Sequence, residues 1–124
     1  MKRILFAGTP EFSVSALDAL LASEHEVVGV YTQPDRPAGR GRKLKASPVK
    51  ERAVDADIPV FQPEKLRDPK FMKAMSDLKP DAFVVVAYGR IIPIDVLSIP
   101  KLGNVNVHPS LLPKYRGPSP MQAA

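Results

Sequence analysis

The sequence of 124 residues contains no cysteine, which excludes disulfides and thiolate metal sites within it. It also lacks any other spacing of side chains typical of a metal site. Its start, MKRILFAGTPEF, has a basic tip but only a short apolar run before Gly8. That run is too short for a signal peptide and far too short for a membrane span, so we expect a cytoplasmic protein that does not contact membranes.

Nucleotide-binding fingerprints are missing as well. The tripeptide Gly8-Thr9-Pro10 has neither the spacing of a dinucleotide-binding glycine motif nor the lysine of a phosphate-binding loop. A tight turn into a capped helix is the better interpretation. Apolar residues make up 44% of the chain and charged residues 25%, as in ordinary globular domains. This length suits one domain with one core.

The net positive charge is concentrated in one segment. Residues 33–52 contain seven basic and two acidic side chains, whereas the remainder has eleven of each sign. A neutral domain with one basic arm indicates contact with a polyanion. Within residues 34–44 the arginines alternate with glycine and proline, and no aromatic side chain is present to stack on bases. Contact with backbone phosphates is therefore favoured over base readout, and a solvated charged loop is the alternative.

Strand and helix patterns alternate along the chain. Strands are predicted at residues 3–7, 26–32, 58–63, 81–89 and 103–108, and a short helix at 93–97. Four helices are predicted to begin at Thr9-Pro10, Ser47-Pro48, Asp68-Pro69 and Ser119-Pro120. Residues 33–46 are interpreted as a long loop. This order predicts an α/β fold, a Rossmann-like and mostly parallel sheet with helices on both faces. Because the last helix pattern has only begun at residue 124, we expect an N-terminal piece of a longer protein.

Two polar residues lie close together near the end of the last predicted strand. Asn106 and His108 are two positions apart, so both side chains project from one face of a strand. Open α/β sheets bind ligands at the carboxyl ends of their strands. Asparagine can donate to a developing oxyanion, and histidine can transfer a proton near neutral pH. A satisfied polar pair that closes the strand is the other interpretation, although two prolines stiffen the PSLLP turn that follows.

Another candidate segment follows the most strand-like stretch, VVVAYGRIIP. Tyr88, Gly89 and Arg90 are expected at the carboxyl end of that strand, beside the same site. A flat apolar ligand would have room against Ile91 and Ile92. A plain strand-to-helix turn is the alternative.

These segments together resemble the folate-dependent formyltransferases. NVNVHPSLLPKYRG, residues 104–117, resembles the signature of that superfamily. FAGTPEF, YTQPDRPAGRGRKLKASPVK and VVVAYGRIIP narrow the resemblance to the N-terminal domain of the methionyl-tRNA formyltransferase family. The resemblance extends over essentially the whole chain.

The resemblance implies a function and a set of site residues. The activity would be transfer of a formyl group from 10-formyltetrahydrofolate to the methionine amino group of initiator tRNA, by a monomer without a metal. Asn106 and His108 would be catalytic. The folate would contact Ser110, Leu111, Leu112, Pro113, Tyr88, Gly89, Arg90, Ile91 and Ile92. The tRNA would contact Arg36, Arg40, Arg42, Lys43 and Lys45.

The sequence also departs from the family's pattern. The family's catalytic aspartate and its C-terminal β-barrel lie beyond residue 124, so residues 1–124 are expected to form a truncated formyltransferase domain that is inactive by itself. A sugar-nucleotide N-formyltransferase would share the asparagine, the histidine and the folate turn but would have little use for the basic arm. An inactive fragment that binds folate or RNA is a further alternative.

Overall fold

A five-stranded parallel sheet forms the centre of the protein, in the order β5-β2-β1-β6-β7. The computed structural model describes residues 1–38 and 43–107. The strands of the sheet are β1 (Arg3–Gly8), β2 (Glu26–Tyr31), β5 (Val60–Phe61), β6 (Ala82–Val86) and β7 (Asn104–Val107). The chain runs from β1 to one edge of the sheet and then returns to the other side of β1 with β6. The strand order therefore reverses between β1 and β6, which is where open α/β sheets form their binding crevice.

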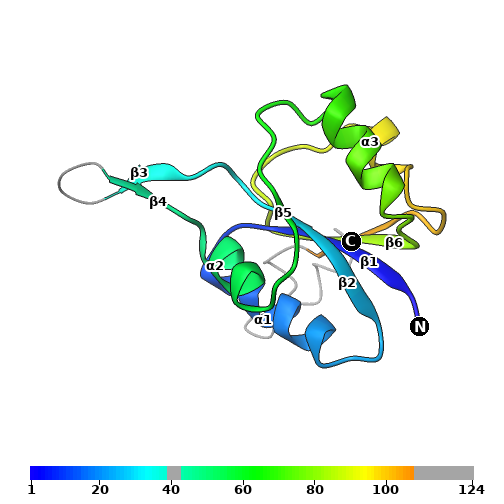
Figure 1. Ribbon diagram of the computed structural model, residues 1–124, viewed down its shortest axis with the longest axis horizontal. Helices are drawn as coiled ribbons and strands as arrows, with labels where there is room; N and C mark the ends of the chain where they lie inside the picture. The colour runs from blue at the N-terminus through cyan, green and yellow to red at the C-terminus, as the bar shows by residue number, and fades with distance from the viewer. Residues whose placement is uncertain (39–42, 108–124) are drawn as a thin grey trace, which may run out of the picture.

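Helices cover both faces of the sheet, which confirms the predicted fold class. Helices α1 (Glu11–Leu21) and α2 (Pro48–Asp55) lie on one face, and α3 (Pro69–Asp77) lies on the other (Figure 1). The short helix α4 (Ile94–Leu97) belongs to the α3 side, where Val96 is fully buried.

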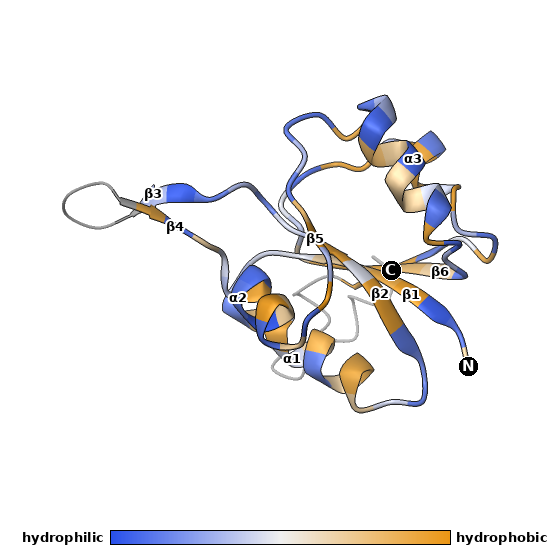
Figure 2. Ribbon diagram, viewed as in Figure 1, coloured by the Kyte–Doolittle hydropathy of each residue, from blue (hydrophilic) through white to orange (hydrophobic). Residues whose placement is uncertain are grey.

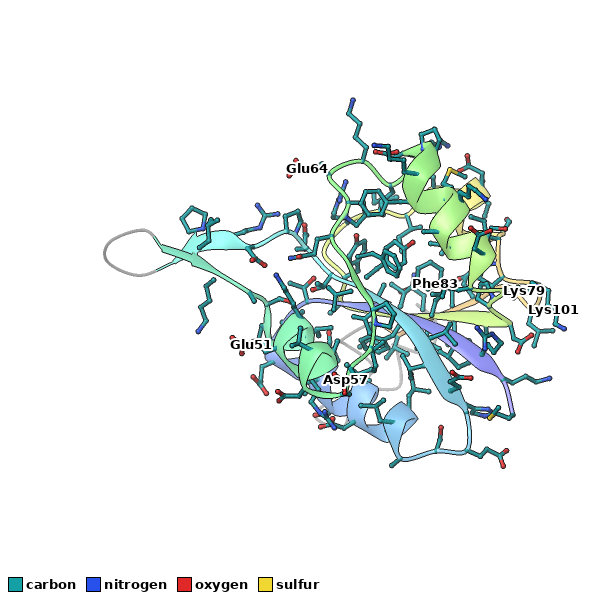
Figure 3. All side chains as sticks on the ribbon, in the orientation of Figure 1. Glu51, Asp57, Glu64, Lys79, Phe83 and Lys101 are labelled. Atoms are coloured by element: carbon teal, nitrogen blue, oxygen red, sulfur yellow. The ribbon has the colours of Figure 1, made fainter. Side chains whose placement is uncertain are left out.

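The two faces have separate hydrophobic cores because side chains alternate along each strand. In β1, Leu5 and Ala7 pack on the α3 side, whereas Phe6 packs on the side of α1 and α2. Apolar residues fill the central strands, as Figure 2 shows for β1 and β2. Phe83, labelled in Figure 3, belongs to the core on the α3 side.

Two of the predicted helix starts are confirmed in atomic detail. Ser47 caps α2 by accepting a hydrogen bond from the Lys50 amide at 3.1 Å, and Asp68 caps α3 through the Lys70 amide at 2.9 Å. The prediction that Thr9 caps α1 is wrong. The N-cap is Pro10, and the Thr9 hydroxyl donates instead to the Tyr88 carbonyl at 2.8 Å.

The interpretation of residues 33–46 as a loop without secondary structure is also wrong. Strands β3 (Arg36–Ala38) and β4 (Lys43–Lys45) pair in antiparallel register and form a hairpin that projects away from the sheet (Figure 1). Pro37 lies opposite Leu44 in this pair. Proline argues against a central strand but is tolerated in an isolated two-stranded ribbon, where every strand is an edge.

Part of the predicted site falls outside the described residues. The helix predicted at Ser119-Pro120 also lies outside them. The predicted site residues that the structure does not describe are Arg40, Arg42, His108, Ser110, Leu111, Leu112 and Pro113. Within the described ranges, no helix is long and apolar enough to cross a membrane.

Candidate functional site

A cavity of about 330 Å³ opens beside the carboxyl ends of β6 and β7. Its walls come from the end of β6, the segment that follows it, α4 and the end of β7. The lining residues are Val85, Ala87, Tyr88, Gly89, Arg90, Ile91, Ile92, Leu97, Asn106 and Val107. This volume lies at the lower end of the range for small-molecule pockets. The cavity also lies at the end of the sheet formed by the carboxyl ends of the strands, where open α/β sheets bind ligands.

Asn106 places an amide side chain in this cavity. It pairs in register with Val85 of β6, so it shares the face of Val85, which belongs to the core on the α3 side. Asn106 is exposed, and no side-chain hydrogen bond engages its amide within the described residues. As far as the described residues go, its donor and acceptor groups are open to a ligand.

The segment from Tyr88 to Ile92 forms one wall of the cavity, with different exposure at each position. The Ile91 side chain is 93% exposed, whereas Ile92 is 9% exposed and belongs to the core. Tyr88 is 2% exposed, and its hydroxyl has no hydrogen-bond partner within the described residues. Burial raises the pKa of Tyr88 above its ordinary value. The Arg90 guanidinium opposes this shift by its charge and its closeness to the hydroxyl, although its geometry does not make a hydrogen bond there and its N–H groups bind Pro63 and Glu64.

Hydrogen bonds to three other connections hold this wall in place. The Thr9 hydroxyl donates to the carbonyl of Tyr88 at 2.8 Å, and the Gln33 amide donates to the carbonyl of Gly89 at 3.2 Å. Arg90 donates in turn to the carbonyls of Pro63 and Glu64, each at 2.6 Å. Such support is needed because Ala87, which directly precedes the segment, has a φ angle of 53°, a conformation that is strained for a residue with a Cβ. Gly89 has a φ angle of 89°, which a glycine adopts without strain. Consecutive residues 88, 89 and 90 are thus tied to the β1–α1, β2–β3 and β5–α3 connections.

A polar cluster around Asp35 lies at the base of the hairpin, outside the cavity. Asp35 accepts hydrogen bonds from Gln62 at 2.7 Å and from Lys50 at 3.1 Å. The bond from Gln62, followed by the bond from Lys50, lowers the pKa of Asp35 below its ordinary value. Glu64, labelled in Figure 3, lies on the connection between β5 and α3, and with Arg36 and Arg90 it lines a smaller cavity of about 200 Å³.

These contacts divide the basic segment into two parts. Lys50 pairs with Asp35, and Arg52 pairs with Asp18 at 2.6 Å, so both basic groups are neutralised on the body of the protein. Arg36 and Lys45, which face each other across the hairpin, have no acidic partner among the described side chains. Among the described side chains of the basic segment, the positive charge without an acidic partner therefore lies on the hairpin.

The structure brings together some of the predicted site residues and separates others. Asn106 and the segment 88–92 line one cavity, whereas Arg36 and Lys45 lie on the hairpin outside it. Arg90 lines the cavity as expected in location, and its guanidinium also binds main-chain carbonyls of the β5–α3 connection. For Lys43 the structure describes only the backbone, in β4. Among the described residues, no group of three or more His, Cys, Asp or Glu side chains is arranged to hold a metal ion.

Sequence reasoning missed Ser13 and Gln33, and it assigned Thr9 a different role. The Ser13 hydroxyl donates to the Val86 carbonyl at 2.5 Å from a fully buried position. A positional signal was present for Thr9, because it follows the carboxyl end of β1, which flanks the crevice. Gln33 follows the carboxyl end of β2, the strand beside β1, so its signal was weaker.

Comparison with known proteins identifies the family of the chain. The family model described as formyl transferase matches residues 1–124. The methionyl-tRNA formyltransferases of Hydrogenovibrio crunogenus and Ectopseudomonas mendocina are 58% and 60% identical over 122 residues, or 98% of this chain. The chain spans 39% of the length of each of these two relatives.

A solved structure gives a further comparison. Glycinamide ribonucleotide transformylase 1 from Geobacillus kaustophilus superposes with a TM-score of 0.64 at 26% identity. The match covers 99% of this chain and 66% of that one. The chain belongs to the formyl transferase family.

Proposed function

We propose that the protein carrying this chain transfers a formyl group from 10-formyltetrahydrofolate to the α-amino group of methionine on initiator tRNA. The observation that carries the proposal is the single cavity lined by Asn106 and by the segment from Tyr88 to Ile92. The curated relatives, at 58–60% identity, are named methionyl-tRNA formyltransferases. We further propose that residues 1–124 are the N-terminal part of the catalytic domain.

The described residues suit a folate. A folate ring system is flat, with apolar faces and hydrogen-bonding edges, so it needs an apolar slot with a few polar groups. The cavity offers the side chains of Ile91 and Leu97, together with the backbone of Gly89. The folate supplies the activated one-carbon unit, and the protein positions it against the amine. Ser110, Leu111, Leu112 and Pro113 are proposed to complete this wall.

Asn106 is proposed to stabilise the negative charge that develops on the formyl oxygen. Its amide projects into the cavity and has no competing partner among the described side chains, so it is free to donate at that point. Such a donor acts mainly in the transition state, where the oxygen carries most charge. His108 would lie on the same strand face if the alternation of β7 continued, and there it would take the proton released by the amine.

The hairpin is proposed to bind the phosphates of the tRNA. Arg36 and Lys45 supply positive charge that no acidic group compensates in the described structure. Arg40, Arg42 and Lys43 follow in the same arm of the sequence and would extend the contact. The sugar-nucleotide alternative offers no role for a projecting basic hairpin.

One comparison of variants tests the catalytic assignment. In the complete protein, Asn106→Ala should lower kcat for methionyl-tRNA formylation by roughly 100- to 1000-fold, the cost of losing one oxyanion donor. Asn104→Ala is the matched control, because Asn104 lies on the same face of β7 and outside the cavity. If both variants keep the wild-type kcat, or if only folate affinity falls, the proposed role of Asn106 is wrong. A wild-type protein that formylates a sugar nucleotide and not methionyl-tRNA would refute the proposed acceptor.

A further inference from the structure

The side chain of Gln33 bridges the hairpin and the cavity wall. Gln33 follows β2, and its Nε2 donates to the carbonyl of Gly89 at 3.2 Å. Its Oε1 accepts from Nη2 of Arg36, the first residue of β3, at 3.0 Å. One side chain thus contacts both the wall of the candidate folate cavity and the uncompensated charge of the hairpin.

The two partners fix the orientation of the Gln33 amide. The Gly89 carbonyl can only accept a hydrogen bond, and the Arg36 guanidinium can only donate one. A flipped amide would place oxygen against oxygen at Gly89 and nitrogen against nitrogen at Arg36. The bridge therefore has one productive arrangement, and each contact favours the other.

Other contacts secure the hairpin base without touching Gly89. The main-chain N–H of Gln33 donates to the Thr9 hydroxyl at 3.4 Å, and that hydroxyl in turn donates to the Tyr88 carbonyl. Gln62 donates to the Gln33 carbonyl at 3.1 Å and to Asp35 at 2.7 Å. Lys50 also binds Asp35. These contacts secure the backbone where the hairpin leaves the sheet. Among the described side chains of this cluster, Gln33 alone reaches Gly89.

We propose that Gln33 is a positioning residue that couples binding at the hairpin to binding in the cavity, an inference that rests on the proposed function. Arg36 and Gln33 are long side chains that lose rotamer freedom when they are held in place. A phosphate bound by the remaining donors of Arg36 fixes its guanidinium, which fixes the Gln33 amide and then the carbonyl of Gly89. A ligand in the cavity then meets a wall that is already ordered.

This coupling should be favourable, and thermodynamic linkage makes it equal in both directions. Because the ordering cost is shared, RNA at the hairpin strengthens folate binding, and folate strengthens RNA binding by the same factor. We expect about a fivefold effect, near the lower end of the usual range for coupled sites, since the bridge contains only two hydrogen bonds.

The test measures tetrahydrofolate affinity with and without saturating uncharged tRNA, in the complete protein. Neither probe can react, so the titration reports binding alone. In the wild type, tRNA should tighten tetrahydrofolate binding about fivefold. Gln33→Met removes both polar contacts at similar size, and Gln33→Glu keeps an acceptor for Arg36 but loses the donor to Gly89. Both variants should bind tetrahydrofolate equally with and without tRNA.

Gln62→Met is the matched control, because it makes the same chemical change at the hairpin base without touching Gly89. It should retain the coupling. Independent binding of the two probes to the wild type, or unchanged coupling in both Gln33 variants, would overturn the inference. Formylation of methionyl-tRNA by the same wild-type preparation separates the two ideas. Its absence refutes the proposed function, whereas intact formylation without coupling refutes the role of Gln33 alone.

Discussion

Replacing Gly89 by alanine should lower the free energy of unfolding by about 2–3 kcal/mol, for two separable reasons. Gly89 has a φ of 89°, in the region that residues with a Cβ rarely adopt. A Cβ at this position would also lie 2.7 Å from Nε2 of Gln33, closer than atoms pack. The substitution therefore strains the backbone and expels the amide that donates to the Gly89 carbonyl.

Gly103 provides a control for the backbone part of this cost. Its φ is 87°, nearly the same angle, but a Cβ there would meet nothing within 4 Å. Gly103→Ala should cost about 1–2 kcal/mol, the price of a left-handed conformation for an L-residue. Gly89→Ala should cost about 1 kcal/mol more, because it also loses one hydrogen bond.

Urea titration of each purified variant measures its free energy of unfolding. An equal m value in all variants shows that each exposes the same surface on unfolding, so that the free energies can be compared. In a Gln33→Ala background the steric conflict is absent and the hydrogen bond is already lost. There, Gly89→Ala should cost no more than Gly103→Ala. The reasoning fails if the two glycine substitutions cost the same in the wild-type background, or if their difference survives when Gln33 is alanine.

Three further substitutions test other contacts. Tyr88→Phe should leave the urea stability unchanged or raise it by up to about 1 kcal/mol, because the deleted hydroxyl has no partner in the described structure. By the same measurement, Ser13→Ala should cost about 1–3 kcal/mol, since it leaves a buried strand carbonyl without its donor. The hydrogen bond from Gln62 is the main cause of the lowered pKa of Asp35. The ionised carboxylate therefore stabilises the fold at any pH above 3.8, the ordinary pKa of the group. This stabilisation is lost as the pH falls from 3.8 through the lowered pKa. Asp35→Asn should therefore flatten the decline in stability below pH 3.8 in acid titrations.

The sheet and the starts of α2 and α3 were predictable because local and global signals agree in those segments. β6 is a run of apolar, mostly β-branched residues, and Ser47-Pro48 and Asp68-Pro69 combine a cap with a proline in the first turn. The hairpin was not predictable in this way. Its strands contain only three residues each, and their charges and proline are typical of loops.

The candidate site was predictable in location but not in its internal contacts. The rule that ligands bind at the carboxyl ends of parallel strands correctly placed Asn106 beside the segment from Tyr88 to Ile92. It gave no means to see that Arg90 binds two carbonyls of the β5–α3 connection. Gln33 and Gly89 are 56 positions apart, and only the parallel pairing of strands brings their connections together.

The cavity wall depends on side chains outside it, and this dependence has a consequence for variants. Thr9 and Gln33 donate to main-chain carbonyls of the wall, so a change in the wall's own side chains leaves those bonds available. A change at either donor should therefore shift the wall without altering any residue that lines the candidate folate cavity. The second contact of the Thr9 hydroxyl is the main-chain N–H of Gln33 at 3.4 Å, which a substitution at Thr9 leaves in place on the backbone. The second contact of the Gln33 side chain is a hairpin arginine with no acidic partner in the described structure. Substitutions at Thr9 should therefore alter tetrahydrofolate affinity to the same extent whether or not tRNA is bound, whereas those at Gln33 should alter the difference between the two conditions.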